Sequence, residues 1–206
     1  MKNLKPLLII LLVCNSNLLI GQVSSKINQE FAEPILVDSN STIIIPIEYN
    51  SGLFTSNKLS WSYYANIIFY NFKEDKYKKL FEKDTYIHEF KTFNYSRLNS
   101  DIKKYSTSKV IFFFVKNVDY NNDGKINEDD PSILYKSDTQ GNNLLKLTSE
   151  SESAVSLEIF EKQKFALIKI QRNVTNDKVF NFKDNDYYYI KLDLDTFKLG
   201  NKIEIK

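Results

Sequence analysis

The stretch VIFFFVKNVDYNNDGKINEDDPSILY, residues 110–135, contains two short apolar runs separated by a polar segment. The first run, residues 110–115, consists only of Val, Ile and Phe, which are enriched in β-strands. Its length of six residues suits a strand and is short for a helix. The second run, residues 133–135, follows Pro131. The stretch therefore predicts two strands that are joined by a long polar connection.

The rest of the chain repeats this pattern of short runs rich in Ile, Val, Phe and Tyr between polar turns. Several runs alternate apolar and polar residues, which is typical of a sheet with one solvated face. The other candidate strands are residues 35–37, 42–47, 66–70, 144–147, 155–160, 165–170, 187–194 and 203–205. We expect an all-β fold of antiparallel sheets in a single domain, residues 22–206. Only residues 94–105 and a segment near Leu80 are expected to form a short helix or an irregular loop.

Three stretches look like the same hairpin, with an apolar strand, a polar turn and a returning strand. The middle one, SDTQGNNLLKLT at residues 137–148, resembles the blade-edge hairpin of TolB-type β-propeller repeats. The residues that carry the resemblance are Asp138, Gly141, Leu147 and Thr148. Six blades of about 40 residues would exceed the length of this chain. The resemblance therefore implies blade-like hairpins in a partial-propeller or sandwich-like arrangement.

The polar segment DYNNDGKINEDD, residues 119–130, resembles the calcium loop of EF-hand and dockerin-type repeats. In such loops, oxygen atoms at alternate positions face the ion and a glycine permits the sharp turn. The predicted ligands are Asp119, Asn121, Asp123, the main-chain carbonyl of Lys125, Asn127 (directly or through water) and Asp130. Gly124 would supply the turn, and Ile126 would anchor the loop to the core. Asp130 stands where an EF-hand has Glu, a difference that dockerin-type loops accept.

The segments on both sides of this loop are predicted strands, so we expect no helix pair that opens or closes on ion binding. This favours a structural Ca²⁺ over a sensor site. The alternative is an acidic, Asn-rich surface turn that binds no ion. Calcium is millimolar outside the cell, so a site with a dissociation constant of about 10⁻⁴ M would still be occupied there.

A second copy of the loop is predicted at residues 173–184, NVTNDKVFNFKD, at a shift of 54 residues. Asn173, Thr175, Asp177 and Asp184 fall on the ligand positions, but Lys178 replaces the glycine. The formal charge of the ligand set falls from −3 to −2. We expect a degenerate copy that keeps its shape and binds no ion.

Residues 1–21 have the features of an export signal. Two lysines, Lys2 and Lys5, precede an apolar run at residues 6–13. That run is too short to span a bilayer, which needs about 20 apolar residues. We therefore expect an exported protein that is periplasmic, displayed on the cell surface or secreted.

Two processing routes remain open. Cleavage after the small residue Gly21 would make Gln22 the new N-terminus. Alternatively, LLVC at residues 11–14 resembles a bacterial lipobox, so residues 1–13 would be removed and Cys14 would carry a lipid. Val13 departs from the Gly, Ala or Ser that is usual before a lipobox cysteine, and this favours simple cleavage.

The composition excludes several classes of function. The chain has 42% hydrophobic residues, which argues against disorder. It has a single cysteine, Cys14, and a single histidine, His88, so disulfide frameworks, thiolate or imidazole metal sites and Ser-His-Asp catalysis are not expected. Residues 1–21 hold two lysines and no acid, so residues 22–206 hold 26 basic and 26 acidic residues. This balance argues against a nucleic-acid partner.

The leading hypothesis is a non-enzymatic envelope or secreted protein, stabilised by calcium, that binds a protein or a glycan. The second hypothesis is a secreted hydrolase, active on glycans, that works with two carboxylates, for which Glu128, Asp129 and Asp130 are candidates. The third is an accessory subunit of an envelope complex. Aromatic residues cluster at Trp61, Tyr63 and Tyr64 and at Tyr187–Tyr189. They form either a sugar-stacking platform or part of the core, and the core is the more common role for such clusters.

Overall fold

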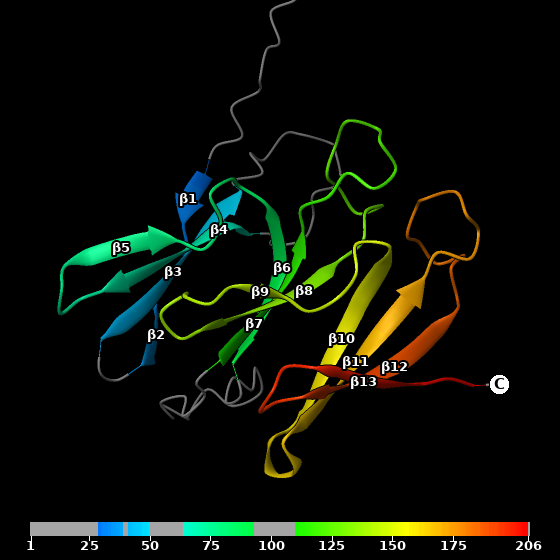
Figure 1. The fold of residues 1–206 in the computed structure, drawn as a ribbon. Helices are drawn as coiled ribbons and strands as arrows, with labels where there is room; N and C mark the ends of the chain where they lie inside the picture. Colours follow the sequence, from blue (N-terminus) through cyan, green and yellow to red (C-terminus); the bar gives the residue numbers. More distant parts are fainter. Residues whose placement is uncertain (1–28, 39–40, 50–63, 93–109, 206) are drawn as a thin grey trace, which may run out of the picture.

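The computed structural model describes residues 29–38, 41–49, 64–92 and 110–205, and these residues form an all-β structure (Figure 1). The prediction of an all-β, antiparallel fold is confirmed. Among the described residues, no helix is long and apolar enough to cross a membrane. The predicted export signal, with Cys14, lies outside the described residues, as do Trp61, Tyr63 and the predicted helix or loop at residues 94–105.

The strands fall into three units, one of five strands and two of four, which we call the first, second and third units. The first unit consists of β1 (Gln29–Phe31) and β2 (Ile35–Asp38), which share one edge, with β3 (Thr42–Tyr49), β4 (Tyr64–Asn71) and β5 (Lys76–Lys79). The second unit consists of β6 (Tyr86–Thr92), β7 (Val110–Lys116), β8 (Ile133–Asp138) and β9 (Leu145–Lys146). The third unit consists of β10 (Glu152–Phe160), β11 (Phe165–Arg172), β12 (Tyr187–Asp193) and β13 (Leu199–Ile203), with a short 3₁₀ turn at Glu161–Gln163.

All strand pairs are antiparallel. The first and second units join in one nine-stranded sheet, and among the described residues Tyr64 and Ile87 are the one pair that links them. The third unit is a separate four-stranded sheet. The described sheets do not close on themselves, so the propeller-like arrangement remains a prediction.

The hairpin turns of the three units are built in the same way. In each, a side-chain oxygen at the end of one strand accepts hydrogen bonds from main-chain amides in the turn, which is the usual role of Asp and Asn there. The three acceptors are Asn71, Asp138 and Asp193. In the middle turn, Gly141 has a φ of +72°, and an added Cβ would lie 2.5 Å from the ring of Phe69 in the first unit. Gly141 is therefore required both by its backbone and by the packing between units.

The core lies in two layers, one on each face of β7. Alternate residues of a strand point to opposite faces of the sheet. Phe112 and Phe114 face the third unit, where they pack with Leu157, Ile168, Ile170, Ile190 and Leu192. Ile111, Phe113 and Val115 face the first unit, where they pack with Ile44, Ile67 and Phe69. The uninterrupted apolar run at residues 110–115 is explained by burial on both faces.

Candidate metal centre

The predicted calcium loop, residues 119–130, connects β7 to β8 and is called the first loop (Figure 1). Its N-terminal half is folded around three side chains. The amide of Asp123 donates both to Asp119 Oδ1, at 3.1 Å, and to Asn121 Oδ1, at 3.0 Å. Asp119 Oδ2 accepts from the amide of Gly124 at 2.9 Å. The predicted ligands at the first, third and fifth positions are thus brought together.

Two residues of this half have left-handed backbone conformations. Asn122 has a φ of +61°, and Gly124 has a φ of +81°. An added Cβ on Gly124 would meet no atom within 4 Å. The glycine is therefore favoured by its backbone angle alone, as the sequence pattern predicted.

Asp130, the predicted twelfth-position ligand, is fully buried. Its Oδ1 accepts from the amide of Tyr120 and its Oδ2 from the amide of Asn127, both at 2.8 Å. The carboxylate therefore ties the beginning of the loop to its end. A carboxylate has about four lone-pair positions, so these two bonds leave two for a further partner.

A buried lysine lies beneath the loop. Lys116, at the end of β7, donates from Nζ to the main-chain carbonyl oxygens of Glu128, at 3.2 Å, and of Asp130. Burial lowers the pKa of Lys116 to about 8, although the negative charges of Asp130, Glu128 and Asp129 act to raise it. The loop is thus partly neutralised from the core side.

The remaining predicted ligands complete the same network. The amide of Lys125 donates to Asp123 Oδ1 at 2.8 Å. Asn127 Nδ2 lies 3.4 Å from Asp123 Oδ2, and Asn127 Oδ1 accepts from the amide of Asp129. The donor set is made only of oxygen atoms, which is the chemistry that Ca²⁺ requires. In the part of the chain that the structure describes, no group of three or more His, Cys, Asp or Glu side chains is already placed to hold a metal ion.

Residues 173–184, the second loop, connect β11 to β12 along the same path. At a shift of 54 residues, five hydrogen bonds recur. Asp184 accepts from the amide of Val174 through Oδ1 and from the amide of Asn181 through Oδ2. Asp177 Oδ1 accepts from the amide of Val179. Asn181 accepts from the amide of Lys183 through Oδ1 and from the amide of Asp184 through its main-chain carbonyl. The positive φ angles recur at Asn176, +57°, and Lys178, +61°. The prediction that both segments form similar connections between paired strands is confirmed.

The second loop differs in the side chains that face its acidic residues. Thr175 Oγ1 lies 2.9 Å from Asp177 Oδ1 and 3.0 Å from Asp184 Oδ1, so its one hydroxyl hydrogen is shared between the two carboxylates. Asn173 Nδ2 lies 3.5 Å from Asp177 Oδ1. The Val179 amide and the Thr175 hydroxyl lower the pKa of Asp177. Burial acts to raise the pKa of Asp184, but the amides and hydroxyl that it accepts lower it overall. The carboxylates of both loops accept hydrogen bonds from their own loop, and the second loop adds a hydroxyl to these donors.

The two loops contact each other, which sequence reasoning did not anticipate. The amide of Phe180 donates to the carbonyl of Asp129 at 2.8 Å, and the rings of Phe180 and Tyr120 lie 5.6 Å apart between centroids. Phe180 is buried, whereas its counterpart Ile126, the expected anchor of the first loop, is half-buried. The sequence feature that could have indicated this contact is the apolar residue at the eighth position of both segments.

The other candidate residues have simpler positions. His88 lies on β6, and burial, aided by the charges of Lys116 and Lys91, lowers its pKa to about 4. Tyr188 is a core residue, but Tyr187 and Tyr189 lie on the outer face of the third unit, so the aromatic cluster is only partly core.

In comparisons with known proteins, no family model, curated protein or solved structure matches this chain.

Proposed function

We propose that this chain is an exported, non-enzymatic β protein of a bacterial envelope or secretome, in which a structural Ca²⁺ bound by the first loop stiffens one end of the molecule. The proposal rests on the comparison between the loops. Both share five backbone hydrogen bonds, but only the second has a Thr hydroxyl that donates to its carboxylates. In the first loop the corresponding residue, Asn121, accepts through its oxygen.

The charge of the first loop supports the same conclusion. Asp119, Asp123 and Asp130 bring three formal negative charges into one twelve-residue segment, and Glu128 and Asp129 adjoin them. Lys116 compensates this charge only from the buried side, through main-chain carbonyl oxygens. A divalent cation on the exposed side would neutralise the remaining repulsion between Asp119 and Asp123. The ion would be held by the predicted ligands of the first loop, Asp119, Asn121, Asp123, Lys125, Asn127 and Asp130.

A binding role is supported by the apolar side chains that the β surface exposes. Phe31 is 72% exposed and Tyr77 is 73% exposed, and both belong to the first unit. Large aromatic residues at the surface are typical anchors for partners. The predicted partner is a protein or a glycan, and a lipid on Cys14 would hold the protein at a membrane.

The calcium part of this proposal can be tested by calorimetric titration of Ca²⁺ into the exported protein. We expect saturable binding of one ion per chain, lost in Asp123→Asn and kept in the matched second-loop variant Asp177→Asn. Absence of saturable binding at millimolar calcium would refute the structural-ion proposal.

The export part can be tested by intact-mass and N-terminal analysis of the protein recovered outside the cytoplasm. A chain that begins at Gln22, or an acylated chain that begins at Cys14, is expected. A chain that retains Met1 would contradict export by a cleaved signal.

A further inference from the structure

One residue of the second loop packs on the first loop without being one of its predicted ligands. Phe180 lies at the eighth position of the second loop and is 6% exposed. Its ring lies 5.6 Å from that of Tyr120, between centroids, at an interplanar angle of 47°. Its amide donates to the carbonyl of Asp129 at 2.8 Å. Phe180 therefore contacts the first loop near both of its ends, at the second and at the eleventh position.

Both of the contacted residues adjoin predicted ligands. Tyr120 lies between the ligands of the first and third positions, and its amide donates to Asp130 Oδ1 at 2.8 Å. Asp129 directly precedes Asp130, and its amide donates to Asn127 Oδ1 at 2.7 Å. Groups that are bonded to a metal ligand orient it. A movement of Tyr120 or Asp129 would therefore displace the oxygen atoms that are expected to surround the ion.

The first loop has only a weak apolar anchor of its own. Ile126, which occupies its eighth position, is half-buried. The hydrogen bonds that fold its N-terminal half, residues 119–125, are exposed to solvent. A segment with exposed hydrogen bonds and little apolar packing opens at a low cost in free energy. The contact with Phe180 supplies the buried packing that this half lacks.

The second loop holds Phe180 in place through its main chain. Gln171 is buried at the end of β11 and donates from Nε2 to the carbonyl oxygens of Asn181 and Asp184, both at 2.8 Å. These bonds fix the main chain that follows Phe180, and they use carbonyl oxygens, not the carboxylates of the loop. The position of Phe180 thus depends on the path of the second loop and requires no ion there.

We propose that Phe180 is a positioning residue for the calcium site, and that the second loop serves as the support of the first. This inference rests on the calcium site proposed above. Phe180 keeps Tyr120 and Asp129 in place before the ion arrives, and preorganisation of this kind raises affinity because less order has to be gained on binding. It gives the second loop a role that requires its path but not its ligands.

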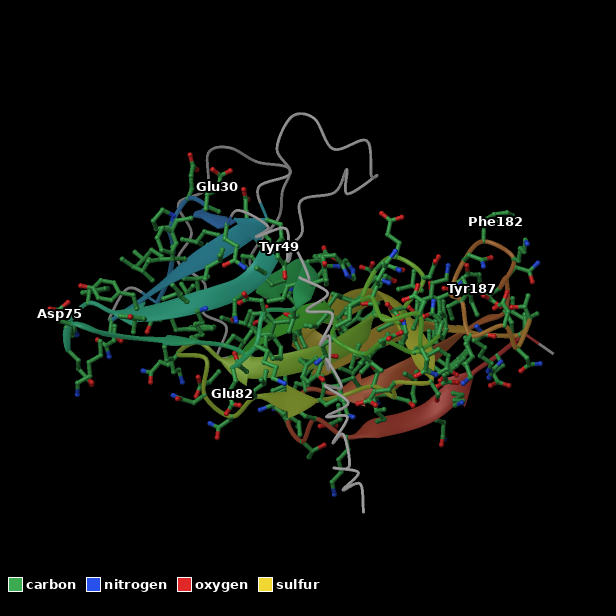
Figure 2. The ribbon with its side chains drawn as sticks, turned by 90° about the horizontal axis from the view of Figure 1, so that it is seen from above. Glu30, Tyr49, Asp75, Glu82, Phe182 and Tyr187 are labelled. Carbon is green, nitrogen blue, oxygen red and sulfur yellow. The ribbon has the colours of Figure 1, made fainter. Side chains whose placement is uncertain are left out.

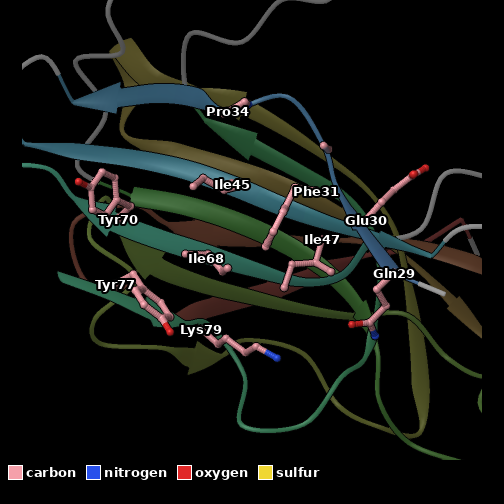
Figure 3. A pocket seen from close by; sticks show the side chains of 11 residues that line it. Gln29, Glu30, Phe31, Pro34, Ile45, Ile47, Ile68, Tyr70, Tyr77 and Lys79 are labelled. Carbon is pink, nitrogen blue, oxygen red and sulfur yellow. The ribbon is translucent and has the colours of Figure 1, made fainter. Parts of the chain in front are cut away.

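Two other residues provide matched controls. Phe182 belongs to the same loop and is 86% exposed, and Figure 2 shows it at the opposite end of the molecule from Glu30 and Asp75 of the first unit. Ile68 is buried like Phe180 but belongs to the first unit. It lies on the floor of an apolar groove of about 720 Å³, which β1 and β5 border (Figure 3). Truncation of Ile68 therefore removes buried packing from a different part of the molecule.

The first test is calorimetric titration of Ca²⁺ into the exported protein, with circular dichroism to show that each variant is folded. Phe180→Ala should raise the Kd for calcium about tenfold, since loss of a group that orients metal ligands typically weakens binding by that factor or more. Tyr120→Ala removes the same ring contact from the first loop and should have a similar effect, so it tests the contact even if Phe180→Ala does not fold. The double variant should be no weaker than the single variants, because the two residues act through one contact. Phe182→Ala and Ile68→Ala should bind calcium like the wild type.

Amide hydrogen exchange in chelator separates this inference from the calcium proposal. The amides of Tyr120 and Asn127 both donate to Asp130, and they should exchange about tenfold faster in Phe180→Ala than in the wild type or in Ile68→Ala. Faster exchange in a protein whose wild type binds no calcium would refute the structural ion and still support the positioning role. Unchanged exchange would overturn the inference. A calcium affinity that Phe180→Ala leaves intact, or that Ile68→Ala weakens equally, would overturn it as well.

Discussion

The first and second loops have the same backbone and different chemistry. In both, a buried twelfth-position aspartate accepts main-chain amides from the beginning and the end of the loop, Asp130 in one and Asp184 in the other. The first and third positions differ: Asp119 and Asn121 accept hydrogen bonds, whereas Asn173 and Thr175 donate them. The comparison separates the residues that shape such a loop from those that would bind the ion.

The sixth position of the two loops also distinguishes the shape of the loop from its residue type. Lys178 has the left-handed conformation that Gly124 has in the first loop. A non-glycine residue there costs about 1 kcal/mol. The path of the second loop is thus preserved in spite of this strain, because Asp184 and Asp177 fix the amides around it.

The largest expected effect comes from removing the buried aspartate at the twelfth position of the second loop. Asp184→Ala should lower the free energy of unfolding by about 3 kcal/mol, because it leaves several partly buried amide and hydroxyl donors without their acceptor. If the second loop binds no ion, as we propose, the loss should be equal in calcium and in chelator. Chemical denaturation measures it. A loss that appears only in calcium would show that the second loop also binds an ion.

The comparison can be sharpened by rebuilding the first loop in the second. Asn173→Asp, Thr175→Asn and Lys178→Gly together replace the internal donors, restore the charge of −3 and supply the glycine. We expect calorimetry to show two calcium ions per chain instead of one. Lys178→Gly alone should raise stability by up to about 1 kcal/mol through relief of the left-handed lysine, without a second ion. If the triple variant still binds one ion, these three residues do not explain the difference in calcium binding between the loops.

The smallest expected effect concerns Lys116, whose counterpart at the shift of 54 residues is Ile170. The pKa of Lys116 is lowered to about 8 in the folded protein, so the unfolded chain binds more protons above that pH. Stability should therefore rise with pH by about 1 kcal/mol between pH 8 and 9 relative to Lys116→Met. Urea denaturation at several pH values measures this difference. Parallel pH profiles for the two proteins would contradict the buried, partly desolvated lysine.

Much of the fold could be predicted from residue types alone. The β-branched and aromatic runs marked most strands, and the spacing of Asp, Asn and Gly marked both loops. The edge strand β1 (QEF) was missed, and the strand that returns after β4 was expected at residues 79–81 and not at β5 (KYKK), because these residues are largely polar or charged and carry no strand pattern. They are strands because β3 and β4 provide partners for their main-chain groups. The groove, which these strands border, was therefore not predictable.

The candidate metal centre was predicted as a set of positions, but not as a geometry. The sequence could not show that the buried Asp130 accepts hydrogen bonds from two amides. An aspartate at that position can bind an ion or can fix the backbone of the loop, and the residue type is the same in both cases. Nor could it show that Phe180 contacts Asp129, because this depends on how the second and third units stack. The donors of the second loop, Thr175 above all, were visible in the sequence, and their consequence became clear only from the hydrogen bonds.

The most direct test of the difference between the loops is thermal unfolding of the exported protein in millimolar calcium and in chelator. An ion at 100 times its dissociation constant stabilises the folded state by about 2.7 kcal/mol, which corresponds to a rise of about 5–10 °C in Tm for a chain of this length. We predict this rise in the wild type and in Asp177→Ala, and its loss in Asp123→Ala. Equal Tm values in calcium and chelator for the wild type would contradict the account, because the first loop would then be an acidic turn without an ion.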